Sequence, residues 1–210
     1  RSLSEVVRAR PDGTRPLLVV DGISSVGAIP LPTDMWGCDV VVAASQKAWM
    51  APPGLAMLSV SARAWEAMDR ATCPRFYWDL RAARRYAGRG QTPWTPAVSV
   101  LYGLRSALQM MRAEGLEAIY ARHRRVAQRL REGAQALGLQ LFGDPAYASD
   151  TVTTLRVPPG MDGEALVARV REQGVVVAGG QGQLKGQVLR VGHLGHVDVL
   201  RALAAGLAAG

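Results

Sequence analysis

The chain has 210 residues, of which 49% are hydrophobic, and a formal net charge of +8. This length and composition suit one or two globular domains with a sizeable core. No apolar run approaches the roughly 20 residues of a membrane span, and no secretory signal pattern is present, so we expect a cytoplasmic protein with no membrane partner. Only Cys38 and Cys73 occur, spaced apart from each other and from the histidines, which predicts no metal site.

Arginine supplies almost all of the positive charge, because Lys47 and Lys185 are the only lysines in the chain. A basic chain raises the question of nucleic-acid binding. The most basic helical stretch, residues 122–131, places its arginines away from the side that holds Val126 and Leu130, as a solvated helix face does. We therefore expect no nucleic-acid partner.

The first strand signal is a short continuous apolar run at residues 17–20, typical of a strand buried on both faces. Asp21 follows it, and a turn rich in glycine and serine comes next. A second apolar run, residues 40–44, ends in the same way, at the sequence Ser-Gln-Lys that contains Lys47. If the two strands are parallel, a carboxylate and an amine reach one edge of a sheet, where open α/β sheets bind ligands.

Lys47 is a candidate for imine formation with a carbonyl compound. An amine must lose its proton to attack a carbonyl, and burial at a strand end favours that loss. The competing interpretation is a lysine whose ammonium group lies in solvent. A lysine for a Schiff base and an aspartate for a pyridinium nitrogen are the minimal equipment of a pyridoxal phosphate enzyme. Asp21 and Lys47 together therefore indicate that cofactor.

The later part of the chain reads as helices followed by an α+β pattern. From about Pro96 the apolar residues have the spacing of a helix with one buried face. Thr92 and Thr95 come just before it, where threonine is most simply an N-cap. Beyond this helix we expect a helix over residues 116–136, a strand over 151–157, a helix over 163–172, strands over 175–178 and 188–191, and a helix over 197–208.

Arg190 is the one charged residue in the last predicted strand. An inward arginine there is costly unless an anion pairs with it. Its planar guanidinium group matches a carboxylate bidentately, and amino-acid and keto-acid substrates both carry that group. A structural salt bridge is the competing explanation. His193, in the glycine-rich turn that follows, either approaches the substrate or has a structural role.

Four ordered motifs resemble those of the class V aminotransferases, pyridoxal phosphate enzymes of fold type I, in the alanine-glyoxylate and serine-pyruvate branch. The motifs are DGISSVG (21–27), SQK (45–47), TPWTP (92–96) followed by LYGL (101–104), and VLRVG (188–192). The resemblance implies an α/β fold. Residues 1–114 would be the C-terminal part of a large cofactor-binding domain with a mostly parallel sheet, and residues 115–210 a small α+β domain with its connecting helix.

The resemblance also implies roles around the cofactor. Lys47 would hold pyridoxal phosphate as an internal aldimine and then shuttle a proton, while Asp21 would keep the pyridine nitrogen protonated. Ile23 would pack against one face of the ring, which is compatible with an ordinary core position. Gln46 would donate its amide to the cofactor phosphate, unless it only caps the strand end.

The resemblance further implies a homodimer with shared active sites, because Thr92 and Thr95 would reach the phosphate of the neighbouring subunit's cofactor. Arg190 would bind the substrate carboxylate. The implied reaction moves an amino group from a small amino acid, such as alanine or serine, to glyoxylate or pyruvate. A lyase or cysteine desulfurase of the same fold, or a non-catalytic relative, are the alternatives. Because the family's large domain starts well upstream of Arg1, we expect a C-terminal part that is inactive alone.

Overall fold

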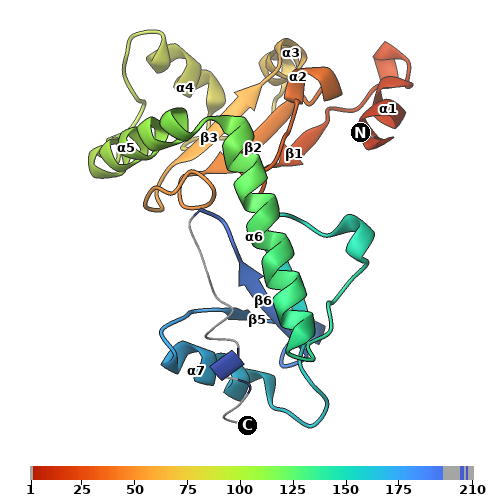
Figure 1. Ribbon diagram of the computed structural model, residues 1–210. Coiled ribbons are helices and arrows are strands. Elements are labelled where there is room, and N and C mark those ends of the chain that lie inside the picture. Colours follow the sequence, from red (N-terminus) through yellow and green to blue (C-terminus); the bar gives the residue numbers. More distant parts are fainter. Residues whose placement is uncertain (1, 196–203, 206, 208–210) are drawn as a thin grey trace. The chain divides into compact units, whose positions relative to one another are not determined.

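The computed structural model describes residues 2–195, 204, 205 and 207, and its chain divides into two compact units (Figure 1). The first unit comprises Arg1–Val26 and Leu31–Gln109, and the second comprises Gly27–Pro30 and Met110–Gly210. The division by contacts therefore falls a few residues before the domain boundary predicted after residue 114, and that boundary stays a prediction.

The first unit is built on a three-stranded sheet in the order β1-β2-β3. Strands β1 (Val19–Asp21) and β2 (Val40–Ala44) are parallel, as predicted, whereas β3 (Ala56–Val60) is antiparallel to β2. The described sheet is thus mixed, where we predicted a mostly parallel one. The reason is the connection of residues 45–55, which is too short for the crossover that a parallel pair needs.

Helix α3 packs on this sheet through its apolar side. Ala64 and Met68 of the helix line one apolar hollow together with Val40 and Val60 of the strands. The Ser61 side chain caps the start of the helix by accepting a hydrogen bond from the Ala64 backbone N–H. The helices of this unit are α1 (Ser2–Arg8), the 3-10 turn η1 (Asp12–Thr14), α2 (Thr33–Trp36), α3 (Ala62–Arg70), α4 (Leu80–Ala87) and the greater part of α5 (Val98–Glu114).

An ion pair between buried Asp39 and partly buried Arg63 closes the sheet at the beginning of β2. The Asp39 carboxylate, 3% exposed, accepts hydrogen bonds from the Leu18 N–H at 2.8 Å, the Ser61 hydroxyl at 3.0 Å and the Arg63 guanidinium. Arg63 also donates to two backbone carbonyls before β1. Burial alone raises the pKa of Asp39, but the hydrogen bonds from Arg63 and Leu18 outweigh it and hold the pKa below its ordinary value.

The second unit packs two helices on an antiparallel sheet in the order β4-β6-β5. Its core joins Leu130 of α6, Leu155 of β4, Leu166 of α7 and Leu189 of β6, all buried. The elements are α6 (Leu116–Ala136), η2 (Pro145–Tyr147), β4 (Val152–Arg156), α7 (Gly163–Glu172), β5 (Ala178–Gly179), η3 (Gly182–Leu184) and β6 (Val188–Gly192).

The sequence predicted most of these elements. The predicted ranges for β2, α6 and α7 are confirmed to the residue, and β1 is shorter than its apolar run. The strand predicted over residues 175–178 is wrong for its first three residues: Val176 is 78% exposed, Val177 is buried, and pairing with β6 begins only at Ala178. The helix predicted over residues 197–208 lies largely outside the described residues. No helix in the part of the chain that the structure describes is long and apolar enough to cross a lipid bilayer.

Candidate active site

Asp21 and Lys47 lie at the same edge of the sheet in the first unit. Asp21 is the last residue of β1 and is in register with Val42 of the parallel strand β2. Lys47 follows the end of β2 by three residues. Since parallel strands end at the same edge, the predicted meeting of a carboxylate and an amine at one sheet edge is confirmed as a placement of the backbone.

The turn after β1 holds the Asp21 side chain at this edge. Asp21 is exposed, and its Oδ1 accepts a hydrogen bond from the Ile23 N–H at 2.9 Å. The next residue, Gly22, donates its N–H to the Val42 carbonyl at 2.9 Å. A Cβ atom at Gly22 would lie 2.6 Å from Val26 and 3.1 Å from that carbonyl, so the turn requires glycine at this position. Ile23 is partly buried, as a residue that packs beside the site would be.

Lys47 lies in a tight turn beyond β2. Its side chain is partly buried, its carbonyl accepts the Met50 N–H at 3.0 Å, and the residues Ser45 and Ala48 beside the turn are buried. No carboxylate of the described residues forms an ion pair with its amine. Gln46, the neighbour predicted to contact a phosphate, is exposed.

Ser45 is a site residue that sequence reasoning missed. It is fully buried, its hydroxyl donates to the Pro52 carbonyl at 2.7 Å, and the same oxygen accepts the Leu55 N–H at 3.3 Å. These contacts close the loop that carries Lys47. The one signal in the sequence was a small polar residue at the end of an apolar run, and such residues are common there.

Thr92 and Thr95 are both exposed, in the segment before α5. Because the helix begins at Val98, neither threonine stands at its N-cap position, and the simple capping interpretation is wrong. The Thr92 hydroxyl donates to the Trp94 carbonyl at 2.6 Å. The Thr95 hydroxyl has no hydrogen bond to any other residue that the structure describes.

The threonine segment is fixed to a group of exposed aromatic side chains. The Trp94 indole N–H donates to the Tyr77 carbonyl at 3.2 Å, and its ring stacks on the Tyr77 ring with centroids 5.2 Å apart. The Phe76 ring lies tilted against the Trp94 ring at the same centroid distance. Stacked aromatic rings hold a surface segment more firmly than loop residues alone, so Thr95 is presented by an ordered segment.

Arg190 belongs to the second unit, in the central strand β6. It is partly buried and faces Thr154 of β4 and Ala178 of β5 in the register of the sheet. Its Nε donates to the Gly179 carbonyl at 2.9 Å. None of the ion pairs within the described residues involves Arg190, so the structure gives no support to the salt-bridge explanation.

His193 has the surroundings of a structural residue. It is 1% exposed, and its Nε2 lies 3.0 Å from the hydroxyl of Thr153 on β4. Burial lowers the pKa of His193 to about 4, so the ring is neutral at pH 7.

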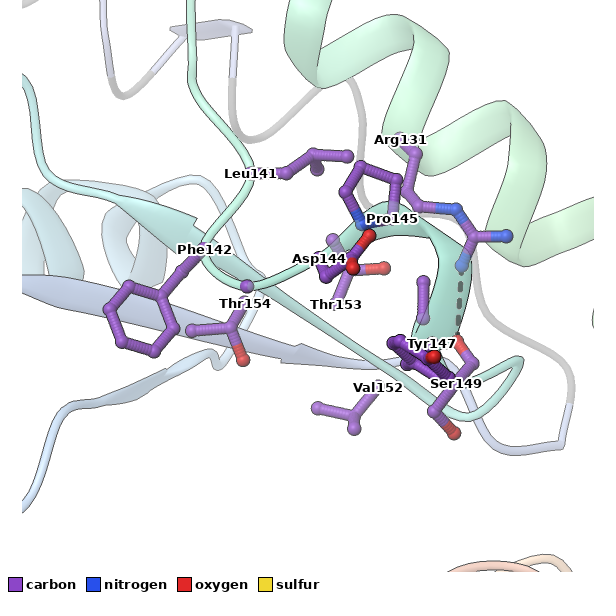
Figure 2. A pocket seen from close by; sticks show the side chains of 12 residues that line it. Arg131, Leu141, Phe142, Asp144, Pro145, Tyr147, Ser149, Val152, Thr153 and Thr154 are labelled. Carbon is purple, nitrogen blue, oxygen red and sulfur yellow. Dashed lines mark hydrogen bonds between the residues drawn. The ribbon is translucent and has the colours of Figure 1, made fainter.

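A separate hollow in the second unit contains none of the predicted site residues (Figure 2). Figure 2 shows Arg131 of α6 directed toward Ser149, to whose carbonyl it donates at 3.1 Å. Asp144, also in the lining, accepts the Ala146 N–H at 2.9 Å. These groups fix the loop around the hollow, so we place the candidate active site at the edge of β1 and β2. Within the described ranges, no three His, Cys, Asp or Glu side chains gather as metal ligands do.

The residues at the β1 and β2 edge fit pyridoxal phosphate. Asp21 engages one carboxylate oxygen with Ile23, and no described residue donates to the other, which leaves it for a pyridinium N–H. The Lys47 amine has no carboxylate partner in the described part that would hold it as an ion pair. Both groups stand at an edge with hydrogen-bonding capacity left over, as a cofactor with a ring nitrogen and an aldehyde requires.

Comparisons with known proteins found similar chains over most of this sequence. The chain is 46% identical over 193 residues to the soluble hydrogenase small subunit of a Synechococcus species, covering 90% of this chain and 50% of the relative. It is 41% identical over 189 residues to L-aspartate-glyoxylate aminotransferase of Paracoccus denitrificans, covering 89% and 48%. The chain thus spans about half the length of the curated relatives that it matches.

Among solved structures, alanine-glyoxylate aminotransferase from Nostoc matches with a TM-score of 0.89 and 31% identity, over 99% of this chain and 56% of that one. The α/β fold of the chain is therefore that of an aminotransferase over a little more than half of the solved protein. The sequence profile of the aminotransferase class-V family matches residues 3–199. The chain belongs to the class V aminotransferase family.

Proposed function

We propose that this chain is part of a pyridoxal phosphate-dependent aminotransferase that moves an amino group from a small amino acid to glyoxylate or pyruvate. The observation that carries the proposal is the placement of Asp21 and Lys47 at one edge of two parallel strands. The names of the relatives belong to those proteins and differ between hydrogenase and aminotransferase, so the choice rests on the residues of this chain.

Four residues of the first unit would hold the cofactor. The Asp21 carboxylate would accept the pyridinium N–H with its second oxygen, and Ile23 would contact the ring face. The Lys47 amine would bind the cofactor's aldehyde carbon, and the exposed Gln46 amide would donate to the phosphate. When bound, pyridoxal phosphate supplies an electron sink for the charge that develops on the substrate α carbon.

Lys47 and Asp21 have separate tasks in the reaction. The Lys47 Nζ would take the proton from the substrate α carbon and deliver it to the cofactor carbon that is bonded to the substrate nitrogen. The Asp21 carboxylate would stabilise positive charge at the pyridine nitrogen through a charge-assisted hydrogen bond. The partial burial of Lys47 supports its task, because it limits competition by water.

Arg190 would bind the carboxylate that amino-acid and keto-acid substrates share. The contact of its Nε with the Gly179 carbonyl orients the guanidinium and leaves the two terminal nitrogens as a fork. Glyoxylate as acceptor is supported by the glyoxylate aminotransferases among the relatives, and pyruvate by a solved pyridoxamine-pyruvate aminotransferase. An arginine recognises only the carboxylate, which all amino acids share. We therefore propose the amino donor as a class, the small amino acids.

We propose a homodimer in which Thr95 reaches the phosphate of the partner's cofactor. The Thr95 hydroxyl has no hydrogen-bond partner among the described residues, which supports this role. Thr92 is the weaker candidate, because its proton is already donated to the Trp94 carbonyl. We also propose that residues 1–114 are the C-terminal part of a large domain whose sheet is mostly parallel, followed by a small domain at 115–210. The match to about half of the solved relative supports this organisation.

Titration with pyridoxal phosphate tests the proposal. The wild-type protein, in its full natural length, is expected to develop the yellow absorbance of a lysine-bound cofactor. Lys47→Ala is expected to remain colourless, whereas Lys185→Ala, which removes the other lysine of these 210 residues, is expected to match the wild type. A colourless wild type, or colour that survives in Lys47→Ala, would contradict the proposal.

A screen of amino donors against glyoxylate and pyruvate tests the reaction type. An aminotransferase gives a keto-acid product from the donor and an amino acid from the acceptor in equal amounts. Release of sulfide, or of pyruvate without any acceptor, would instead assign a desulfurase or a lyase. In that case Cys73→Ala shows whether the exposed thiol takes part.

A further inference from the structure

We propose that Ser45 is a positioning residue for Lys47, acting through the closed loop of residues 45–55. The inference rests on the function proposed above, because it concerns the same lysine. Ser45 itself would not contact the cofactor. It fixes the backbone from which the Lys47 side chain extends.

Ser45 makes four hydrogen bonds, and all of them stay within the loop. Its N–H donates to the Leu55 carbonyl at 3.1 Å, and its carbonyl accepts the Ala51 N–H at 2.9 Å. Its hydroxyl donates to the Pro52 carbonyl at 2.7 Å and accepts the Leu55 N–H at 3.3 Å. The side chain is fully buried, so water does not replace these contacts when they are lost.

Lys47 lies inside the part of the loop that these bonds close. The Lys47 carbonyl accepts a hydrogen bond from the Met50 N–H. The next residue, Ala51, donates its N–H to the Ser45 carbonyl. Two nested hydrogen bonds therefore bracket the lysine, and the outer one ends on the Ser45 carbonyl. By contrast, the Lys47 side chain has no ion pair of its own in the described part of the chain to hold it.

The loop also carries backbone strain. Met50 has a φ of +54°, and it is the one non-glycine residue with positive φ in the part of the chain that the structure describes. A side chain in the left-handed region is unfavourable by itself and persists where the surroundings impose it. We infer that the Ser45 contacts impose it, and that without them the turn relaxes and the amine leaves its position at the sheet edge.

Ser61 provides a matched control. Its hydroxyl also donates once, to Asp39 at 3.0 Å, and accepts once, from the Ala64 N–H at 3.1 Å. It stands at the opposite end of the strands, before α3. Ser61→Ala thus removes the same pattern of contacts as Ser45→Ala, and only the second change involves the lysine loop. Ser45→Cys keeps the size of the buried side chain and a weaker donor.

The experiment compares wild type, Ser45→Ala, Ser45→Cys and Ser61→Ala in the full natural-length protein. First, the cofactor-free proteins are labelled with trinitrobenzenesulfonate, and mass spectrometry gives the labelling of Lys47 relative to Lys185. Second, pyridoxal phosphate capture is trapped with borohydride and timed. We expect Ser45→Ala to raise the labelling ratio and to slow capture about tenfold, because misplaced reacting atoms cost rate steeply. Ser45→Cys should be intermediate and Ser61→Ala unchanged in both readouts.

An unchanged labelling ratio in Ser45→Ala would overturn the inference, and so would an equal change in Ser61→Ala, which would indicate general loosening. The two proposals fail in different ways. If the wild type captures no pyridoxal phosphate, the proposed function fails, while the labelling ratio still decides whether Ser45 positions Lys47.

Discussion

Two aspartates stand at opposite ends of the sheet in the first unit, and their surroundings differ completely. Asp39, before β2, is buried and accepts hydrogen bonds from Leu18, Ser61 and Arg63. Asp21, at the end of β1, is exposed and accepts one hydrogen bond, from Ile23, among the described residues. One carboxylate is fully used by the protein itself, and the other has an oxygen left for a ligand.

This difference is the one expected between a structural carboxylate and a carboxylate that binds a ligand. A buried charge persists only where hydrogen bonds and an opposite charge compensate its lost hydration, and Asp39 has both. A carboxylate that binds a cofactor needs free acceptor capacity at an accessible place, as Asp21 has. The same reasoning distinguishes Lys47, without an ion pair in the described residues, from Lys185, which pairs with Glu164 at 3.4 Å.

The largest expected effect on activity comes from changing the exposed carboxylate, Asp21. Asp21→Asn keeps an oxygen for the Ile23 N–H but removes the charge that would face a pyridinium nitrogen. We expect kcat to fall about a thousandfold, the size typical of a lost preorganised electrostatic contact. The free energy of unfolding should change by less than about 0.5 kcal/mol, as for an exposed site. Steady-state kinetics and urea denaturation measure both. A near-normal kcat in Asp21→Asn would contradict the proposal that Asp21 binds the cofactor.

The largest expected effect on stability comes from changing the partner of the buried carboxylate, Asp39. Arg63→Ala leaves the Asp39 carboxylate buried without its opposite charge, which costs about 3 kcal/mol of unfolding free energy. The kcat of the folded variant, measured well below its melting temperature, should stay within about twofold of wild type because the change is remote from the chemistry. If denaturation shows a loss below about 1 kcal/mol, the pair does not have the structural role assigned to it.

The same variant should show a distinct pH dependence of stability. In the wild type the pKa of Asp39 is held below its ordinary value, so its contribution is complete above the ordinary aspartate pKa and is lost as pH falls through the lowered value. In Arg63→Ala the hydrogen bond and the positive charge of Arg63 are lost while those of Leu18 and Ser61 remain, so the pKa of Asp39 rises and protonation relieves the buried charge at a higher pH than in the wild type. We expect the stability difference between the two proteins to shrink as the pH falls from 6 toward about 3.5. A difference that stays constant in denaturation curves would contradict this account.

A smaller effect is expected at the threonine segment. Thr95→Ala removes a hydroxyl that is free to donate to a phosphate, whereas the Thr92 hydroxyl already donates to the Trp94 carbonyl. We expect the dissociation constant for pyridoxal phosphate to rise about tenfold in Thr95→Ala, the value of one hydrogen bond to a charged group. Thr92→Ala should change it less than about threefold. Equal effects in an absorbance titration would mean that the two threonines act alike.

The sequence located the candidate site because its signals are local. Asp21 and Lys47 each end a continuous apolar run, and two such runs predict buried parallel strands whose ends coincide. Helix α6 was predicted to the residue because its apolar spacing and the glycine after it are also local signals. In the second unit the valines of residues 175–177 gave a strand signal that their environment overrides, since Val176 is exposed.

What the sequence did not predict depends on contacts between distant residues. Asp39 and Arg63 are 24 positions apart and meet only because β3 returns beside β2. Ser45 is important through Pro52 and Leu55, which reach it only after the loop has closed. No pattern of residue types along the chain distinguishes Ser45 from any other serine at a strand end.

The most direct test of the central claim is to trap pyridoxal phosphate on the wild-type protein with borohydride and to map the modified peptide by mass spectrometry. The placement of Asp21 and Lys47 at one sheet edge predicts a phosphopyridoxyl group on Lys47, with Lys185 unmodified. Modification of Lys185 alone, or of neither lysine at saturating cofactor, would contradict the claim that this edge is the active site.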